Sequence, residues 1–97
     1  MCDRNECISL LRKNSHQIQQ EFGVTGLSVF GSVARGDNRS DSDVDILVDM
    51  PPKIFIMNAL KEYLESLLKV SVDLIRRHSH LSPSFISQIS KEAIIIF

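Results

Sequence analysis

FGSVARG at residues 30–36 and the triplet Asp43-Val44-Asp45 are the two segments that decide the fold of this chain. The first closes an apolar run with a Gly-Ser pair, and the second opens another apolar run. Because side chains alternate along a strand, Asp43 and Asp45 are expected to project from the same face. Adjacent carboxylates repel each other, and a divalent cation with oxygen ligands removes that repulsion. The triplet therefore indicates a cation site.

The Gly-Ser pair indicates the other half of such a site. Gly31 lets the backbone approach a phosphate closely, and a helical turn that starts at Ser32 would direct N–H groups at an anion. The segment that follows, residues 36–42, has no hydrophobic period and predicts a loop. Five of the twelve acidic residues lie between Asp37 and Asp49, a local density that fits either a cation site or a solvated loop.

Hydrophobic periodicity predicts alternating helices and strands around this centre. Asp3 and Glu6 have the spacing of a capping box, and Gly23 is suited to end the first helix. Met50-Pro51-Pro52 breaks the second strand, and Ser82-Pro83 starts the last helix. The expected helices are residues 3–22, 32–35, 53–69 and 82–90, and the expected strands are residues 24–30, 43–49 and 70–75. Residues 93–97 are either a last edge strand or the buried end of the last helix, and their β-branched run favours the strand.

The order of these elements predicts the topology of the sheet. The strand–helix–strand unit over residues 43–75 is long enough for a right-handed crossover between parallel strands. The first two strands are expected to be antiparallel. Alternation in the third strand then places Asp73 on the same face as Asp43 and Asp45. We expect a single α/β (α+β) domain over residues 1–97, with a small mixed sheet and helices mainly on one face.

Composition excludes several broad functions. A net charge of −1 argues against a general nucleic-acid binder of the basic-patch type. No apolar run reaches membrane-spanning length, and the charged N-terminus does not resemble a signal peptide. The only cysteines, Cys2 and Cys7, are too few for a disulfide framework, so reduced thiols and a cytoplasmic location are expected.

Three carboxylates that face a Gly-Ser turn suit metal-dependent phosphoryl or nucleotidyl transfer. Asp43 and Asp45 can bridge a pair of Mg²⁺ ions, and Asp73 would be the ligand or general base nearest an attacking hydroxyl. Ser32 and its backbone would contact the β- and γ-phosphates, and Arg35 would neutralise phosphate charge. The order of these elements along the chain is far more specific than a single Asp-x-Asp or Gly-Ser pair.

The chain resembles the DNA-polymerase-beta-like nucleotidyltransferases, and within them the minimal nucleotidyltransferases. The similarity lies in Gly31-Ser32, ten intervening residues and Asp43-Val44-Asp45, and it continues through Ser71–Ile75 and Lys91–Ile95. It implies a polymerase-beta-like palm, two Mg²⁺ ions with ATP as substrate, and an antitoxin role. It also implies transfer of AMP to a tyrosine of a HEPN-domain toxin that is encoded nearby. The metal ligands would be Asp43, Asp45 and Asp73, and the nucleotide contacts Gly31, Ser32 and Arg35.

Other interpretations remain open at this point. Ninety-seven residues leave nothing to grip an acceptor, so the acceptor comes on another chain or an oligomer completes the site. The protein could act by masking its partner without catalysis, or it could modify a small molecule or an RNA end. The remaining charged residues are expected to be ordinary solvated positions, namely Asp37, Asp41, Asp49, Arg76, Arg77, His78 and His80.

Overall fold

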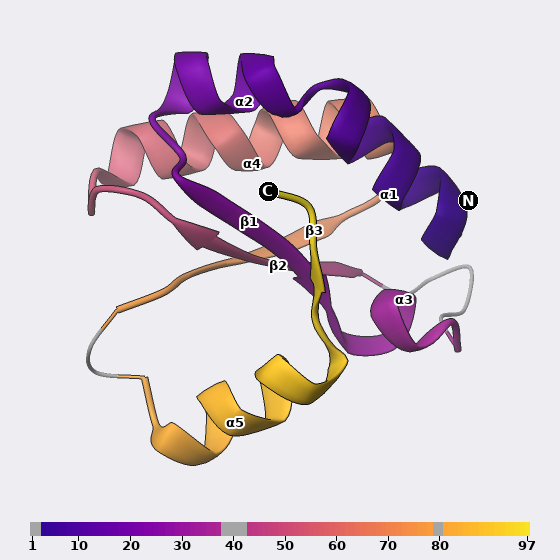
Figure 1. Ribbon diagram of the computed structural model, residues 1–97. Coiled ribbons are helices and arrows are strands. Elements are labelled where there is room, and N and C mark those ends of the chain that lie inside the picture. Colours follow the sequence, from indigo (N-terminus) through magenta and orange to yellow (C-terminus); the bar gives the residue numbers. More distant parts are fainter. Residues whose placement is uncertain (1–2, 38–42, 79–80) are drawn as a thin grey trace.

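In the part of the chain that the structure describes, four strands form one mixed sheet with helices on both of its faces (Figure 1). The structure, a computed structural model, describes residues 3–37, 43–78 and 81–97. Its helices are α1 (Arg4–Lys13), α2 (Ser15–Phe22), α3 (Gly31–Arg35), α4 (Ile54–Leu68) and α5 (Pro83–Glu92), and its strands are β1 (Gly26–Phe30), β2 (Val44–Asp49), β3 (Val72–Arg76) and β4 (Ile94–Ile95).

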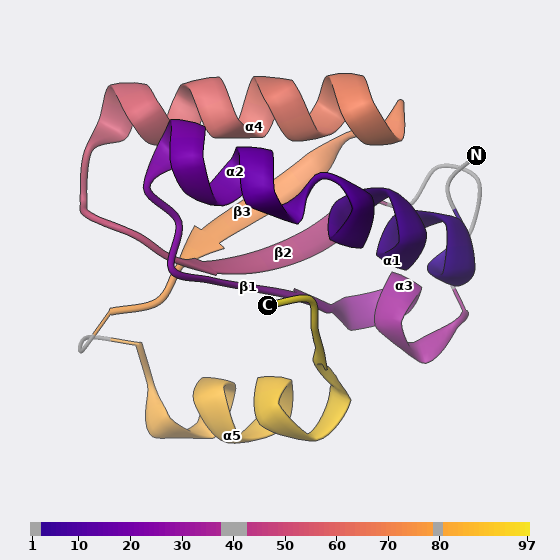
Figure 2. The ribbon, with the colours of Figure 1, turned by 45° about the horizontal axis from the view of Figure 1, so that its top comes forward.

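The strand order is β3-β2-β1-β4, which agrees with the topology that the sequence predicts. β1 pairs antiparallel with β2, and β2 pairs parallel with β3 through the crossover helix α4. β4 pairs antiparallel with β1 and forms the edge of the sheet. Figure 2 shows α1, α2 and α4 on one face and α5 on the other, so the helices lie mainly on one face as expected.

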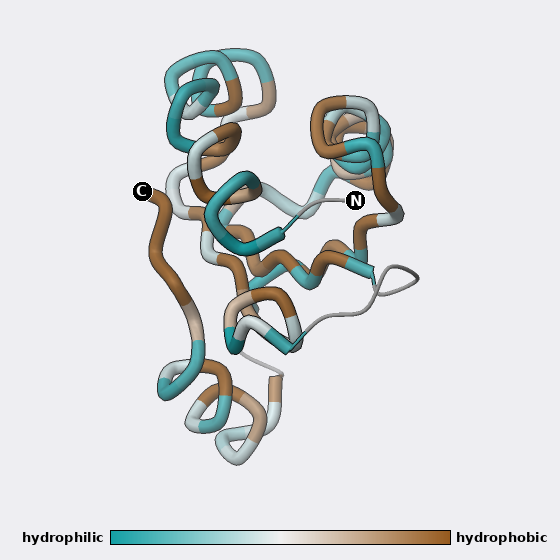
Figure 3. The backbone as a smooth tube through the Cα atoms, turned by 90° about the vertical axis from the view of Figure 1, so that its right-hand side faces the viewer, coloured by the Kyte–Doolittle hydropathy of each residue, from teal (hydrophilic) through white to brown (hydrophobic). Residues whose placement is uncertain are grey.

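The main core lies between the sheet and the helices α1, α2 and α4. Leu60, Leu64 and Leu68 line one side of α4 and are buried, which agrees with the hydrophobic periodicity of residues 53–69. Val44, Ile46 and Val48 come from the facing side of β2. The hydropathy along the chain follows this arrangement, with apolar strands inside and hydrophilic outer helical turns (Figure 3). Burial of this face of β2 leaves its alternate residues for the opposite face.

Local sequence signals set several of the helix ends. The Asp3 side chain accepts a hydrogen bond from the Glu6 backbone N–H at 2.8 Å, and Gly23 ends α2 with φ 66°. The single helix expected over residues 3–22 is wrong, because α1 and α2 are separate helices that meet at Asn14. The Asn14 backbone leaves the helical region, and its side chain donates to the Leu10 carbonyl at 2.8 Å. This competition between side chain and helix explains the break.

Two other expectations need correction. The reduced thiol expected at Cys7 is wrong, since Cys7 is buried and disulfide-bonded; Cys2 lies outside the described residues. The last strand, Ile94–Ile95, is shorter than the expected residues 93–97, and α5 continues to Glu92, past the expected end at residue 90. Ser82 caps α5 as predicted, and its hydroxyl accepts from the Phe85 N–H at 3.1 Å. No helix in the described part of the chain is long and apolar enough to cross a membrane.

Leu64→Ala should lower the free energy of unfolding by about 2–5 kcal/mol, since it removes a fully buried side chain from the interface between α4 and the sheet. Urea denaturation followed by circular dichroism measures the change. Glu62→Ala, an exposed position on the same helix, is the matched control and should change stability by less than about 0.5 kcal/mol. Equal losses in the two variants would contradict the assignment of the core.

Candidate active site

Parallel pairing of β2 and β3 brings Asp45 and Asp73 next to each other. The two residues are direct register partners, and Phe30 of β1 is the register partner of Asp45 on its other side. Asp73 is exposed, so it does not turn into the hydrophobic interior. Asp43 immediately precedes β2 and is also exposed. The face that the sequence predicts for these acids is the face on which they lie.

The surroundings of Asp45 disfavour its ionised form. Partial burial raises the pKa of the Asp45 carboxyl, and the charges of Asp73 and then Asp43 raise it further. A hydrogen bond between Asp45 and Asp73 acts in the same direction, and only the positive charge of Arg35 opposes these effects. The charges of Asp43 and Asp73 therefore both act on Asp45, so the three predicted metal ligands interact with one another.

This donor set fits a hard divalent cation by its chemistry. Carboxylate oxygens are the ligands that Mg²⁺ prefers, and a cation would relieve the repulsion around Asp45. Within the described residues, however, no three His, Cys, Asp or Glu side chains are already arranged to hold a metal ion. Mg²⁺ is commonly held by one or two carboxylates together with substrate phosphates. Ligation by Asp43, Asp45 and Asp73 thus stays a prediction.

Gly31 is the point at which the predicted phosphate turn touches the acids. Its φ is 74°, and a Cβ atom at this position would overlap Oδ2 of Asp45. Only glycine combines this backbone with so close a neighbour. Ser32 follows in the first turn of α3, where no side chain provides a cap. The turn and the carboxylate face are therefore in direct contact.

Arg35 lies at the end of α3 and is held by two carboxylates. It pairs with Asp37 at 3.2 Å and with Glu92 at 2.9 Å, and these partners raise the pKa of its guanidinium. From the sequence, Asp37 is expected to be an ordinary solvated residue, and no role is predicted for Glu92. Because Glu92 lies on α5, far along the chain, sequence spacing carries no signal for this pair.

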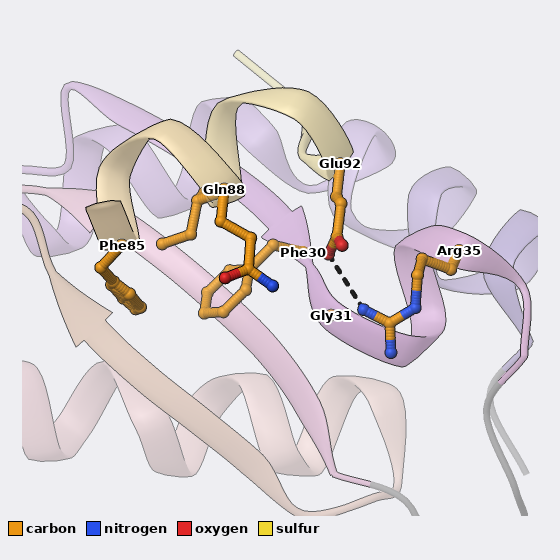
Figure 4. A pocket seen from close by; sticks show the side chains of 7 residues that line it. Phe30, Gly31, Arg35, Phe85, Gln88 and Glu92 are labelled. Carbon is orange, nitrogen blue, oxygen red and sulfur yellow. Dashed lines mark hydrogen bonds and ion pairs between the residues drawn. The ribbon is translucent and has the colours of Figure 1, made fainter. Parts of the chain in front are cut away.

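Helix α5 adds a pocket that the sequence does not reveal. The pocket holds about 200 Å³ between the end of β1 and α5 (Figure 4). Its lining residues are Phe30, Gly31, Arg35, Phe85, Gln88, Ile89 and Glu92. The predicted start at Ser82-Pro83 indicates the helix, but not which of its faces meets the sheet.

Two of the remaining charged candidates, Asp49 and Arg77, line a second pocket of about 360 Å³. Asp49 and Arg77 pair with each other at 3.5 Å at the far end of β2, which fits surface positions. His78 is half-buried rather than exposed. Asp41 and His80, and most of the loop expected over residues 36–42, lie outside the described residues.

Residues 11–96 match the family model of the nucleotidyltransferase domain. The chain belongs to this family. It is a nucleotidyltransferase enzyme, and the resemblance to minimal nucleotidyltransferases is confirmed. It is 42% identical over 81 residues to the protein adenylyltransferase MntA of Thermococcus cleftensis, a match that covers 81% of this chain and 82% of that relative.

Solved structures extend the comparison. One, described provisionally as a minimal nucleotidyltransferase, is 36% identical with a TM-score of 0.77, and the match covers 95% of this nucleotidyltransferase and 94% of that chain. Another, a toxin-antitoxin crystal structure with AMP-PNP, is 26% identical with a TM-score of 0.67, and the match covers 97% and 72% of the two chains. The fold class and the polymerase-beta-like palm are thereby confirmed.

Gly31→Ala should reduce both stability and transferase activity, since the new methyl group would displace the Asp45 carboxylate. We expect a loss of about 1–3 kcal/mol in unfolding free energy and at least about a tenfold loss of activity. Gly36→Ala is the matched control, because Gly36 has φ 80° but no atom within 4 Å of the place that the added methyl group would take. A similar loss of activity in both variants would show that backbone strain, and not the contact with Asp45, is responsible.

Asp45→Asn should raise the thermal midpoint of unfolding at pH 7 in metal-free buffer by a few degrees, on the order of 2–4 °C. A raised carboxyl pKa means that the folded state loses stability as pH rises from about 4, the usual value, through the folded pKa. The gain should therefore shrink as the pH approaches about 3, where the carboxyl is protonated. Calorimetry at both pH values measures it, and a pH-independent difference would contradict the electrostatic cause.

Proposed function

We propose that this nucleotidyltransferase moves AMP from ATP to a hydroxyl group of a partner protein in a Mg²⁺-dependent reaction. The observation that carries the proposal is the register of Asp45 with Asp73 beside the Gly31 turn. The Thermococcus cleftensis relative is named as a protein adenylyltransferase, and a similar toxin-antitoxin structure contains AMP-PNP, an ATP analogue. These relatives support both the nucleotide and a protein acceptor.

Each residue of the site would have a separate task. Asp43 and Asp45 would hold the metal ions with the substrate phosphates, and Asp73 would complete the ligand set or accept the proton of the attacking hydroxyl. When bound, Mg²⁺ neutralises phosphate charge and favours the ionised hydroxyl. Gly31 and Ser32 would position the β- and γ-phosphates, and Arg35 would exchange a carboxylate partner for phosphate.

The balance of the reaction is that of nucleotidyl transfer. The acceptor oxygen forms a bond to the α-phosphorus, and the bond from that phosphorus to the oxygen bridging the β-phosphorus breaks. Pyrophosphate leaves, and the hydroxyl proton passes to a carboxylate or to solvent. The residues of this chain contribute positioning and charge, the two effects on which phosphoryl transfer mainly depends.

The acceptor that fits the family resemblance is a tyrosine of a HEPN-type toxin encoded nearby. The protein would then be a cytoplasmic antitoxin that forms a hetero-oligomer with its target during the reaction. Asp43 and Asp73 are exposed, so their carboxylates are accessible to the surface of a second protein. An acceptor that is itself a folded protein would bring its own contacts to this open face.

Asp43→Ala combined with Asp45→Ala should abolish transfer of AMP to the partner. Incubation of each variant with ATP, Mg²⁺ and the purified product of the adjacent helical reading frame, followed by intact-mass spectrometry, measures the adenylyl groups added. Asp49→Ala is the matched control, because Asp49 lies on the same strand but pairs with Arg77. It should retain activity within about twofold.

Two results would contradict this proposal. Full neutralisation of the partner by the folded double variant would show that the protein masks its target by binding alone. Transfer of labelled AMP to an RNA end or a small molecule, with none to protein, would assign a different acceptor.

A further inference from the structure

We propose that the pocket between β1 and α5 binds the adenine base of the nucleotide, with Phe30 and Phe85 against the ring and Gln88 at its edge. This inference rests on the proposed function and deepens it, since it assigns base recognition to residues that have no role so far. Figure 4 shows that the pocket is built by three elements, with Phe30 from β1, Arg35 from α3, and Phe85, Gln88 and Glu92 from α5.

The walls of the pocket suit a flat aromatic ring. The Phe30 and Phe85 rings lie 6.2 Å apart between centroids and are nearly perpendicular, with an interplanar angle of 86°. Ile89 adds a buried aliphatic surface. A volume of about 200 Å³ is below that of sites for whole drug-sized ligands, so the pocket accommodates one ring system and not an entire nucleotide. Stacking between bases and aromatic side chains is a general source of affinity.

The polar groups of the pocket suit the edge of adenine. Gln88 is exposed, and its amide offers one acceptor and two donors. Glutamine amides pair with the adjacent donor and acceptor of an adenine edge. Arg35 and Glu92 close the end of the pocket near α3 with their ion pair (Figure 4). A base that is held against α5 would thus have its charged phosphate tail next to the cationic side chain.

The strand order favours the adenine base over the acceptor side chain as the ligand of this pocket. Gly31 lines the pocket and also contacts Asp45, so the pocket joins the phosphate turn without interruption. The pocket borders β1, whereas Asp73 lies on β3, on the other side of β2. An acceptor hydroxyl near Asp73 and a base near Phe30 would therefore flank the reacting phosphorus. An acceptor tyrosine in the pocket would instead be separated from Asp73 by β2.

Equilibrium binding without any acceptor tests the proposal. Isothermal titration calorimetry of the protein in the presence of Mg²⁺ measures the dissociation constants of a non-hydrolysable ATP analogue, the matching CTP analogue and inorganic tripolyphosphate. We expect the ATP analogue to bind at least about tenfold tighter than tripolyphosphate. Phe85→Ala, and the bulkier Phe85→Leu that preserves packing, should weaken the ATP analogue about tenfold and leave tripolyphosphate unchanged. Gln88→Ala should remove most of the preference for ATP over CTP.

Two exposed positions serve as matched controls. Phe55→Ala removes a phenylalanine that is 86% exposed on α4, and Gln20→Ala removes an exposed glutamine on α2. Neither residue lines the pocket, so both variants should bind all three ligands like the unmodified protein. Thermal unfolding of each variant confirms that the fold is retained.

The outcomes that contradict this proposal differ from those that contradict the proposed function. Equal affinity of the unmodified protein for tripolyphosphate and the ATP analogue would overturn the base pocket and leave the proposed function intact. Unchanged nucleotide binding in folded Phe85→Leu and Gln88→Ala would do the same, and a raised KM for the acceptor protein in those variants would assign the pocket to the acceptor. Failure of the unmodified protein to bind any of the ligands would overturn the proposed function itself.

Discussion

The contact between the Asp45 carboxylate and the Gly31 backbone is the constraint on which the site depends. It joins the end of β1 to β2 at a position that admits no side chain. Parallel pairing adds Asp73 on the other side of Asp45. Residues at the ends of three neighbouring strands thereby meet at one place. Nucleotidyl transfer depends mainly on such positioning of the reacting groups.

This arrangement destabilises the folded state. The ionised Asp45 carboxylate is half-buried beside two other carboxylates, which is unfavourable and raises its pKa. The opposite face of the same strand compensates, since Val44, Ile46 and Val48 are buried under the helices. The strand thus stabilises the domain through one face and carries the site on the other, because alternation separates the two roles.

Sequence reasoning recovered those parts of the molecule that depend on short-range rules. The capping residues Asp3 and Ser82, the glycine at residue 23 and the placement of Asp73 all follow from local chemistry or alternation. The break at Asn14 was missed because a side-chain hydrogen bond there competes with a favourable apolar pattern. The ion pair of Arg35 with Glu92 was missed because it depends on how α5 packs, which the spacing of residues does not encode.

The position of β3 in the sheet bears on the protein acceptor that we propose. β3 is an edge strand of the sheet in the described part of the chain, and Asp73 is exposed on it. α5 covers the region beside β1 (Figure 2). Because β2 lies between β1 and β3, this region and Asp73 are on opposite sides of Asp45. The covered side suits a small ligand that needs walls, and the open side suits an acceptor that brings its own surface. The asymmetry of the site thus follows from strand order, with the short C-terminal helix placed over one half only.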